Sequence, residues 1–157
     1  MLLLEQACAV LHILSTHTDG DNRKLCEERK ALIGQAGGVK AVTKTMRTHA
    51  SYAELLEYAF GALFYLCIFD NDNRRRVVQA GGINILVNIM KRHATAPKIQ
   101  DEATKALLNL TSTRDIKRKV AEIATEAVEE AKRRFPQLKY PPLLLKHLSK
   151  RKLWRAI

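Results

Sequence analysis

Apolar residues recur along this chain at helical spacing, and three segments repeat the same pattern. Each segment has alanine at its first position and leucine at its fifth and eighth, and its fourth residue is small except at Val10. The aligned segments are residues 7–14, 59–66 and 103–110. Because positions three or four residues apart share one face of a helix, each segment predicts a helix that buries its leucines.

These leucines are expected to form the centre of one hydrophobic core. The predicted core leucines are Leu11, Leu14, Leu63, Leu66, Leu107 and Leu110. Ile83, Leu86, Val87 and Met90 follow a similar spacing and are expected to pack on them. Full burial of each such side chain contributes about 1.5–3 kcal/mol of transfer free energy to folding. The low aromatic content, 6%, also favours a helical core over a sheet.

A pair of glycines is the second repeated marker. The sequence Gln-Ala-Gly-Gly precedes an apolar residue twice, ending at Gly38 and at Gly82, and the two copies are 44 residues apart. Ala59 and Ala103 have the same separation. Glycine tolerates positive φ and close backbone approach, so the pair predicts a sharp corner between two helices. The period lies within the range of about 40–47 residues found in helical solenoid repeats.

Together these markers resemble the armadillo repeat family. Its repeat has a short first helix, a Gly-Gly corner and two longer helices, and the third helix reads close to Ala-x-x-Ala-Leu-x-Asn-Leu. Residues 103–110 match that motif fully, whereas Ile13 and Tyr65 stand where the family has asparagine. The resemblance covers roughly residues 3–134. It implies an all-α, right-handed armadillo or HEAT-like α-solenoid, a superhelix of three-helix repeats.

The repeats are irregular towards both ends. The first copy has about eight extra residues before its glycine pair, near residues 25–32, compared with the second. The third copy has Thr-Glu-Ala-Val at residues 125–128 in place of the pair, so one helix is expected to continue to Arg134. The predicted domains are armadillo repeats over 1–134 and a basic C-terminal capping helix or tail over 135–157. Residues 1–134 comprise a partial first repeat, one full repeat at 70–112 and a degenerate capping repeat at 113–134.

The chain begins inside a third helix, whose apolar side would be bare on its own. We therefore expect either a C-terminal piece of a longer repeat protein or self-association through this helix.

The resemblance also implies where a partner binds, because the third helices of armadillo proteins line a concave groove that holds extended peptides. By position, the groove residues here are Ile13, Tyr65, Lys105 and Asn109. Importin alpha carries a ladder of Trp and Asn at such positions, and this chain keeps only one such Asn, so an import receptor is not expected. Asn109 either bonds a peptide backbone or braces its own repeat. With a lysine in the set, we expect an extended, acidic segment of another protein.

The formal net charge of +11 favours a negatively charged partner. Basic residues occupy equivalent repeat positions and are expected along one edge of the stack: Arg23, Lys24, Arg74, Arg75, Arg76, Lys117, Arg118 and Lys119. This basic edge is either the ordinary solvated face of the first helices, which we favour, or a surface for acidic peptide, anionic membrane lipid or RNA.

The C-terminal stretch is basic as well. From residue 135 onward there is no Asp or Glu, and the last residues include Lys150, Arg151, Lys152 and Arg155. The stretch either caps the last repeat, lies on an anionic membrane or binds a calmodulin-like groove, and we favour the cap because the end of a solenoid must be covered.

No catalytic constellation stands out. The five histidines are scattered, and three widely spaced cysteines form neither a disulfide framework nor a zinc motif. We therefore expect no enzyme, no metal site, no cofactor and no small-molecule substrate. The reduced cysteines favour the cytoplasm, with the nucleus as the alternative.

Overall fold

The chain is described by a computed structural model that places residue 7 and residues 23–149. Within residues 23–149 the fold consists of helices joined by turns. The helices are α2 (Arg23–Gln35), α3 (Gly38–Thr48), α4 (Ala53–Cys67), α5 (Asn71–Gln79), α6 (Gly82–Arg92), α7 (Pro97–Leu110), α8 (Arg114–Arg134) and α9 (Tyr140–Ser149). The predicted all-α fold class is confirmed.

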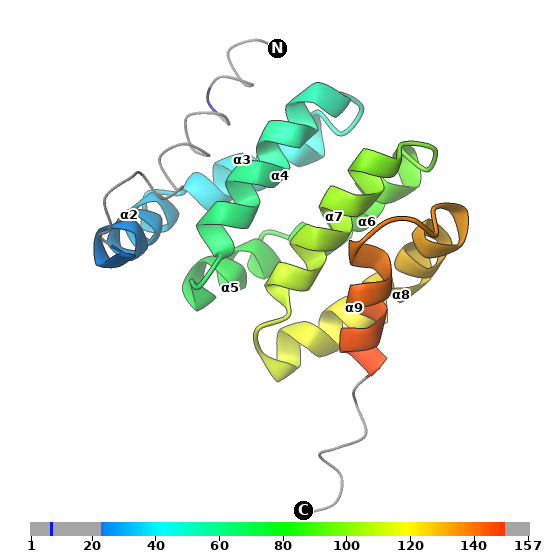
Figure 1. The fold of residues 1–157 in the computed structure, drawn as a ribbon. Helices are drawn as coiled ribbons and strands as arrows, with labels where there is room; N and C mark the ends of the chain where they lie inside the picture. Colours follow the sequence, from blue (N-terminus) through cyan, green and yellow to red (C-terminus); the bar gives the residue numbers. More distant parts are fainter. Residues whose placement is uncertain (1–6, 8–22, 150–157) are drawn as a thin grey trace, which may run out of the picture.

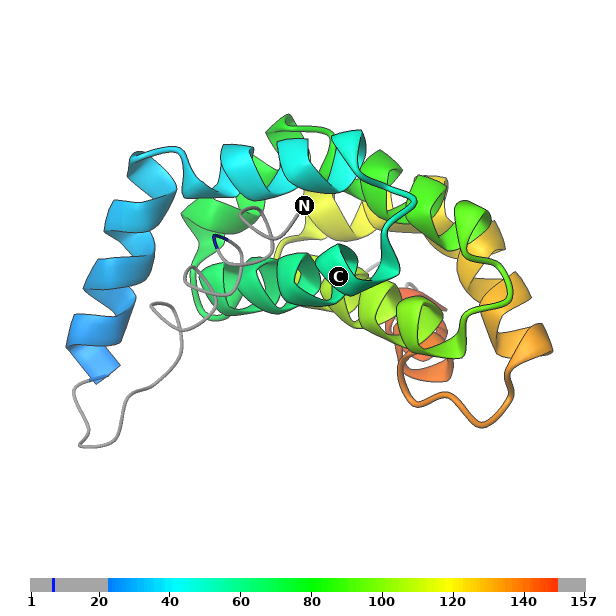
Figure 2. The ribbon, with the colours of Figure 1, turned by 90° about the horizontal axis from the view of Figure 1, so that it is seen from above.

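The helices stack as two triplets followed by a pair (Figure 1). Helices α2, α3 and α4 form one unit, α5, α6 and α7 form the next, and α8 and α9 are the last helices of the described residues. Helices of equal rank pack side by side: α4 contacts α7, which contacts α9, and α3 contacts α6, which contacts α8. Figure 2 shows the α4, α7 and α9 row on the inner side of a curved arc and the α3, α6 and α8 row on the outer side. This arrangement is an α-solenoid.

The glycine pairs form the predicted corners between first and second helices. The first glycine of each pair has positive φ, 90° at Gly37 and 77° at Gly81. The second glycine begins the next helix and lies close to the preceding one, since a Cβ on Gly82 would be 2.9 Å from the Val77 carbonyl oxygen. Gly38 stands equally close to Ile33. The two glycines of a pair therefore serve different physical needs.

The predicted core is largely confirmed within the described residues. Leu63, Leu66, Leu107 and Leu110 are buried, as are Ile83, Leu86, Val87 and Met90. Leu11 and Leu14 lie outside the described residues. The largest fully buried side chain is Phe60, on the same helix as Leu63. Leucine and alanine thus let the inner and outer rows of helices pack closely along one continuous core.

The end of the stack lacks a glycine corner, and one 21-residue helix, α8, stands there. The side chain of Thr113 caps it by accepting from the Ile116 backbone N–H. Helix α9 then packs on both α7 and α8. In the preceding unit, α7 packs in the same way on α4 and α6. Leu144 and Leu148 of α9 are buried, and so are Val120 and Val128 of α8. Helix α9 covers apolar surface that α7 and α8 would otherwise expose.

The longer first copy contributes to a longer first helix. Helix α2 has 13 residues, whereas α5, its counterpart in the next unit, has nine.

Among the helices of residues 23–149, none has the length and apolar character that a bilayer crossing requires.

One buried asparagine links three helices. Asn73 of α5 is fully buried, and its Nδ2 donates to the carbonyl oxygens of Lys30 in α2, at 3.0 Å, and Leu66 in α4, at 2.9 Å. Its Oδ1 accepts from Nη1 of Arg76 at 3.0 Å. The space for this amide exists because Gly34 has no side chain, since a Cβ there would lie 1.8 Å from Oδ1. Adjacent units are therefore joined by a polar contact as well as by apolar packing.

Candidate partner-binding surfaces

The inner row of helices carries three of the four predicted groove residues. Tyr65 lies on α4, and Lys105 and Asn109 lie on α7; all three are partly exposed. Ile13 lies outside the described residues. The rings of Phe64 and Tyr65 meet edge to face with centroids 5.4 Å apart. Phe64 also meets Lys105, so α4 and α7 contribute to one surface on the inner side of the arc.

Lys105 lies where the three inner helices meet. Its Nζ is 4.7 Å from the ring centroid of Phe64 on α4 and 5.8 Å from that of Tyr140 at the start of α9. The same Nζ is 3.2 Å from the nearer carboxylate oxygen of Glu102. Its side chain keeps 25% exposure. The ammonium group is held in place by two rings and one carboxylate, and the side chain as a whole stays partly exposed.

Asn109 is already bonded within the stack. Its Nδ2 donates to the Phe64 carbonyl oxygen at 3.1 Å, and its Oδ1 accepts from Nη2 of Arg74 at 3.1 Å. These contacts fit the brace that the sequence left open as one alternative. The amide keeps one N–H and one lone pair, but its two internal bonds fix its orientation within the stack. Asn109 is therefore a less adaptable candidate contact than Tyr65 or Lys105.

The groove surface has mixed charge. Lys98 of α7 pairs with Glu57 of α4 at 2.6 Å, and Asp101 accepts from the Tyr140 backbone N–H at 2.9 Å. Tyr58 is 44% exposed and lies seven residues before Tyr65, hence on nearly the same face of α4. Sequence reasoning missed Phe64 and Tyr140 as neighbours of Lys105. For Tyr140 no local signal exists, because the contact depends on where α9 packs.

The predicted basic edge is partly used by internal contacts. The three consecutive arginines each bond the side chain three residues earlier: Arg74 with Asn71, Arg75 with Asp72, and Arg76 with Asn73. Lys24 pairs with Glu28 at 4.0 Å. The side chain of Arg23 and the tail residues Lys150, Arg151, Lys152 and Arg155 lie outside the described residues.

The α8 part of that edge is more open. Arg118 and Lys119 are exposed and Lys117 is partly exposed. Arg75 and Lys119 line a shared hollow of about 310 Å³ between α5 and α8, which Asp115 also lines. The first helices thus bring basic residues of two units together, but acidic and amide side chains lie among them.

The described residues contain no group of three His, Cys, Asp or Glu side chains placed to hold a metal ion. Burial raises the pKa of the Cys67 thiol to about 12, so at neutral pH this cysteine is a protonated, apolar core residue. Cys26 is buried too.

The geometry defines a class of protein, the α-solenoids built from stacked helical repeats. The family model described as Armadillo/beta-catenin-like repeat matches residues 70–112, the segment that contains α5, α6 and α7. That segment is similar to an armadillo repeat, and the match confirms the resemblance read from the sequence. No curated protein and no solved structure matches the chain.

Proposed function

We propose that this chain is a non-catalytic scaffold that binds an extended segment of another protein along the inner row of α4, α7 and α9. Armadillo repeats generally act as protein-interaction scaffolds. The observation that carries the proposal is the position of Lys105, a partly exposed cation that contacts Phe64, Glu102 and Tyr140 on the three inner helices. Tyrosine is among the side chains that most often anchor protein interfaces, and a lysine ammonium held in place adds electrostatic complementarity to an acidic segment.

The partner segment is proposed to be acidic. The chain carries a net charge of +11, and Lys105 offers its ammonium group at the centre of the row. Glu57, Asp101 and Glu102 lie on the same row, but each already has a basic group or a backbone N–H as partner. A partner carboxylate therefore has to compete with Glu102 for Lys105, and it gains support from the positive field of the whole chain.

We expect Tyr65→Ala and Lys105→Ala each to weaken partner binding by about tenfold or more while leaving thermal stability nearly unchanged. Both side chains are partly exposed, so their removal opens no internal cavity. Partners are captured from lysate at physiological salt with RNase present, and each captured protein is quantified by mass spectrometry for every variant.

The matched controls are Tyr52→Ala and Lys132→Ala, which remove an exposed tyrosine just before α4, 13 residues from Tyr65, and an exposed lysine of α8 on the outer row. Asn109→Ala is unsuitable as a binding variant because loss of its two internal hydrogen bonds should also lower stability. If all four variants captured the partner equally well, the inner row would not be the binding surface. If nothing but RNA-dependent material were captured, the polyanion alternative would replace the scaffold proposal.

A further inference from the structure

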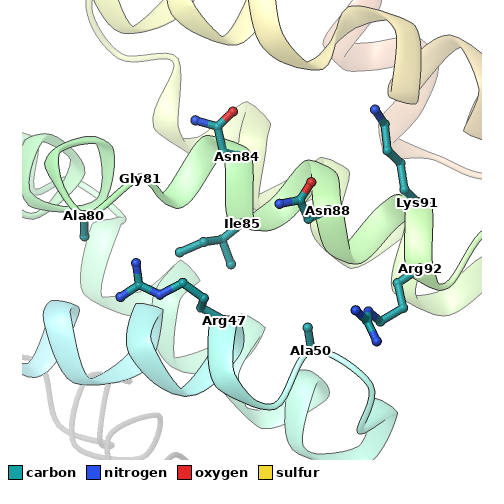
Figure 3. A pocket seen from close by; sticks show the side chains of 9 residues that line it. All are labelled: Arg47, Ala50, Ala80, Gly81, Asn84, Ile85, Asn88, Lys91 and Arg92. Carbon is teal, nitrogen blue, oxygen red and sulfur yellow. The ribbon is translucent and has the colours of Figure 1, made fainter.

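A second surface lies on the opposite, outer side of the arc. A hollow of about 690 Å³ runs between α3 and α6, the second helices of two adjacent units. Its lining extends along α6 from the glycine corner to the last helical turn, and includes Arg47 at the end of α3 and Ala50 just beyond it (Figure 3). None of its lining residues belongs to the inner row described above.

The hollow combines an apolar floor with a cationic rim. Its apolar lining is Ile85, Ala50 and Ala80, and its cations are Arg47, Lys91 and Arg92. No acidic residue lines it. Within the described part of the chain, none of these three cations pairs with a carboxylate. In this respect the hollow differs from the basic edge, where Arg75 pairs with Asp72.

The two arginines stand at opposite ends. Figure 3 shows the Arg47 guanidinium directed towards Ala80, whereas that of Arg92 is directed towards Ala50. Arg92 is held there by donating from Nη1 to the Ser51 hydroxyl at 2.8 Å. Ile85 and Asn88 lie between the two arginines, and the Asn88 amide is exposed. Charge, apolar surface and charge therefore follow one another along the hollow.

From these observations we infer that the hollow between α3 and α6 binds an extended acidic segment of a partner protein, with one apolar side chain on Ile85 and flanking carboxylates on Arg47 and Arg92. Eleven helical steps from Gly81 to Arg92 span about 16 Å, and an extended chain covers that length with about five residues. A guanidinium fork matches a carboxylate, and the Asn88 amide can bond a peptide backbone. This surface is separate from the inner row, and the inference does not rest on the proposed function.

A protein segment fits the hollow better than other polyanions do. Bare phosphate would leave the apolar floor unused. Sites for single-stranded nucleic acid combine a basic groove with aromatic rings on which the bases stack, and no aromatic residue lines the hollow.

The test uses the full chain and a fluorescein-labelled peptide in which a central leucine is flanked on each side by glutamates. We expect Arg47→Glu and Arg92→Glu each to weaken its binding by about tenfold or more, because each places a carboxylate against a peptide carboxylate. Arg118→Glu makes the same charge change at an exposed position of α8, outside the hollow, and should weaken peptide binding less than about threefold at physiological salt. Ser51→Ala removes the hydrogen bond to Arg92 without changing charge, and it separates loss of orientation from loss of charge.

The peptide supplies the second control. Replacing its leucine by serine should weaken binding several-fold, and replacing its glutamates by glutamines should abolish it. Amide shifts in the ¹⁵N-labelled chain should cluster at Arg47, Ile85 and Asn88. Equal losses for Arg47→Glu and Arg118→Glu, indifference to the leucine, or shifts confined to the inner row would each overturn the inference. Tighter binding of anionic lipid vesicles or single-stranded RNA at the same residues would overturn it too.

Discussion

Asn73→Ala should lower the free energy of unfolding by about 3 kcal/mol, which corresponds to a loss of roughly 10 °C in Tm for a chain of this size. The Asn73 amide is fully buried and donates to two backbone carbonyl groups from different helices. Alanine removes both bonds and opens a cavity beside Gly34. The Leu66 carbonyl at the end of α4 loses this donor in the core, whereas the Lys30 carbonyl lies inside α2 and keeps its helical bond. An unsatisfied buried polar group destabilises by about 1–3 kcal/mol, and the cavity adds to that.

Urea unfolding followed by far-UV circular dichroism measures this change. Asn71→Ala is the matched control, because Asn71 is an exposed asparagine of the same helix with a single exposed bond to Arg74. It should change stability by less than about 0.5 kcal/mol. A similar stability for the two variants would mean that the amide of Asn73 does not join the units as described.

The second large effect is expected at the glycine corner. Gly82→Ala should destabilise by about 2–3 kcal/mol, because its new Cβ would lie 2.3 Å from Cγ1 of Val77 and 2.9 Å from the Val77 carbonyl oxygen. Val77 is fully buried and cannot move aside freely. Gly81→Ala should destabilise by only about 1 kcal/mol, since there the positive φ is unfavourable but the space is open.

The pair is compared in the same unfolding experiment, and the order of the two effects is the prediction. A larger loss for Gly81→Ala than for Gly82→Ala would show that backbone conformation, and not close packing against α5, makes the corner depend on glycine. The corresponding glycines Gly37 and Gly38 should show the same order, because Gly38 approaches Ile33 equally closely.

The sequence predicted the parts of the fold that repeat. Leucines at fixed spacing and the two Gly-Gly pairs are local signals, and each has the same physical meaning in every copy. The loss of the glycine pair at residues 125–128 correctly indicated one continuous helix in α8. The repeat logic was sufficient for these features because neighbouring units are built alike.

Features that depend on contacts between units were harder to predict. Asn73 aligns with Ile116 of the next unit, and both residues are buried. The residue type at this position therefore did not reveal that the Asn73 side chain bonds two other helices. The contact of Tyr140 with Lys105 joins α9 to α7 and has no local signature. The arginines at 74–76 suggested an open basic edge, but their partners three residues earlier became evident only with the side chains in place.

The candidate binding surfaces were likewise predicted only in part from the sequence. The family resemblance placed Tyr65 and Lys105 on one row, but only the geometry shows which residues surround Lys105 and that Asn109 is already bonded. The hollow on the outer row combines residues of α3 and α6 that no motif connects.

The central claim is that the inner row binds a partner protein, and site-specific photo-crosslinking tests it most directly. Benzoylphenylalanine replaces Tyr65 in one sample and Lys132, an exposed residue of the outer row, in the other. Both are irradiated in lysate, and crosslinked proteins are identified by mass spectrometry. The proposed function predicts a discrete protein crosslinked at position 65, absent at position 132 and lost when Lys105→Ala is added. Crosslinks of equal yield at both positions, or none at position 65, would contradict it.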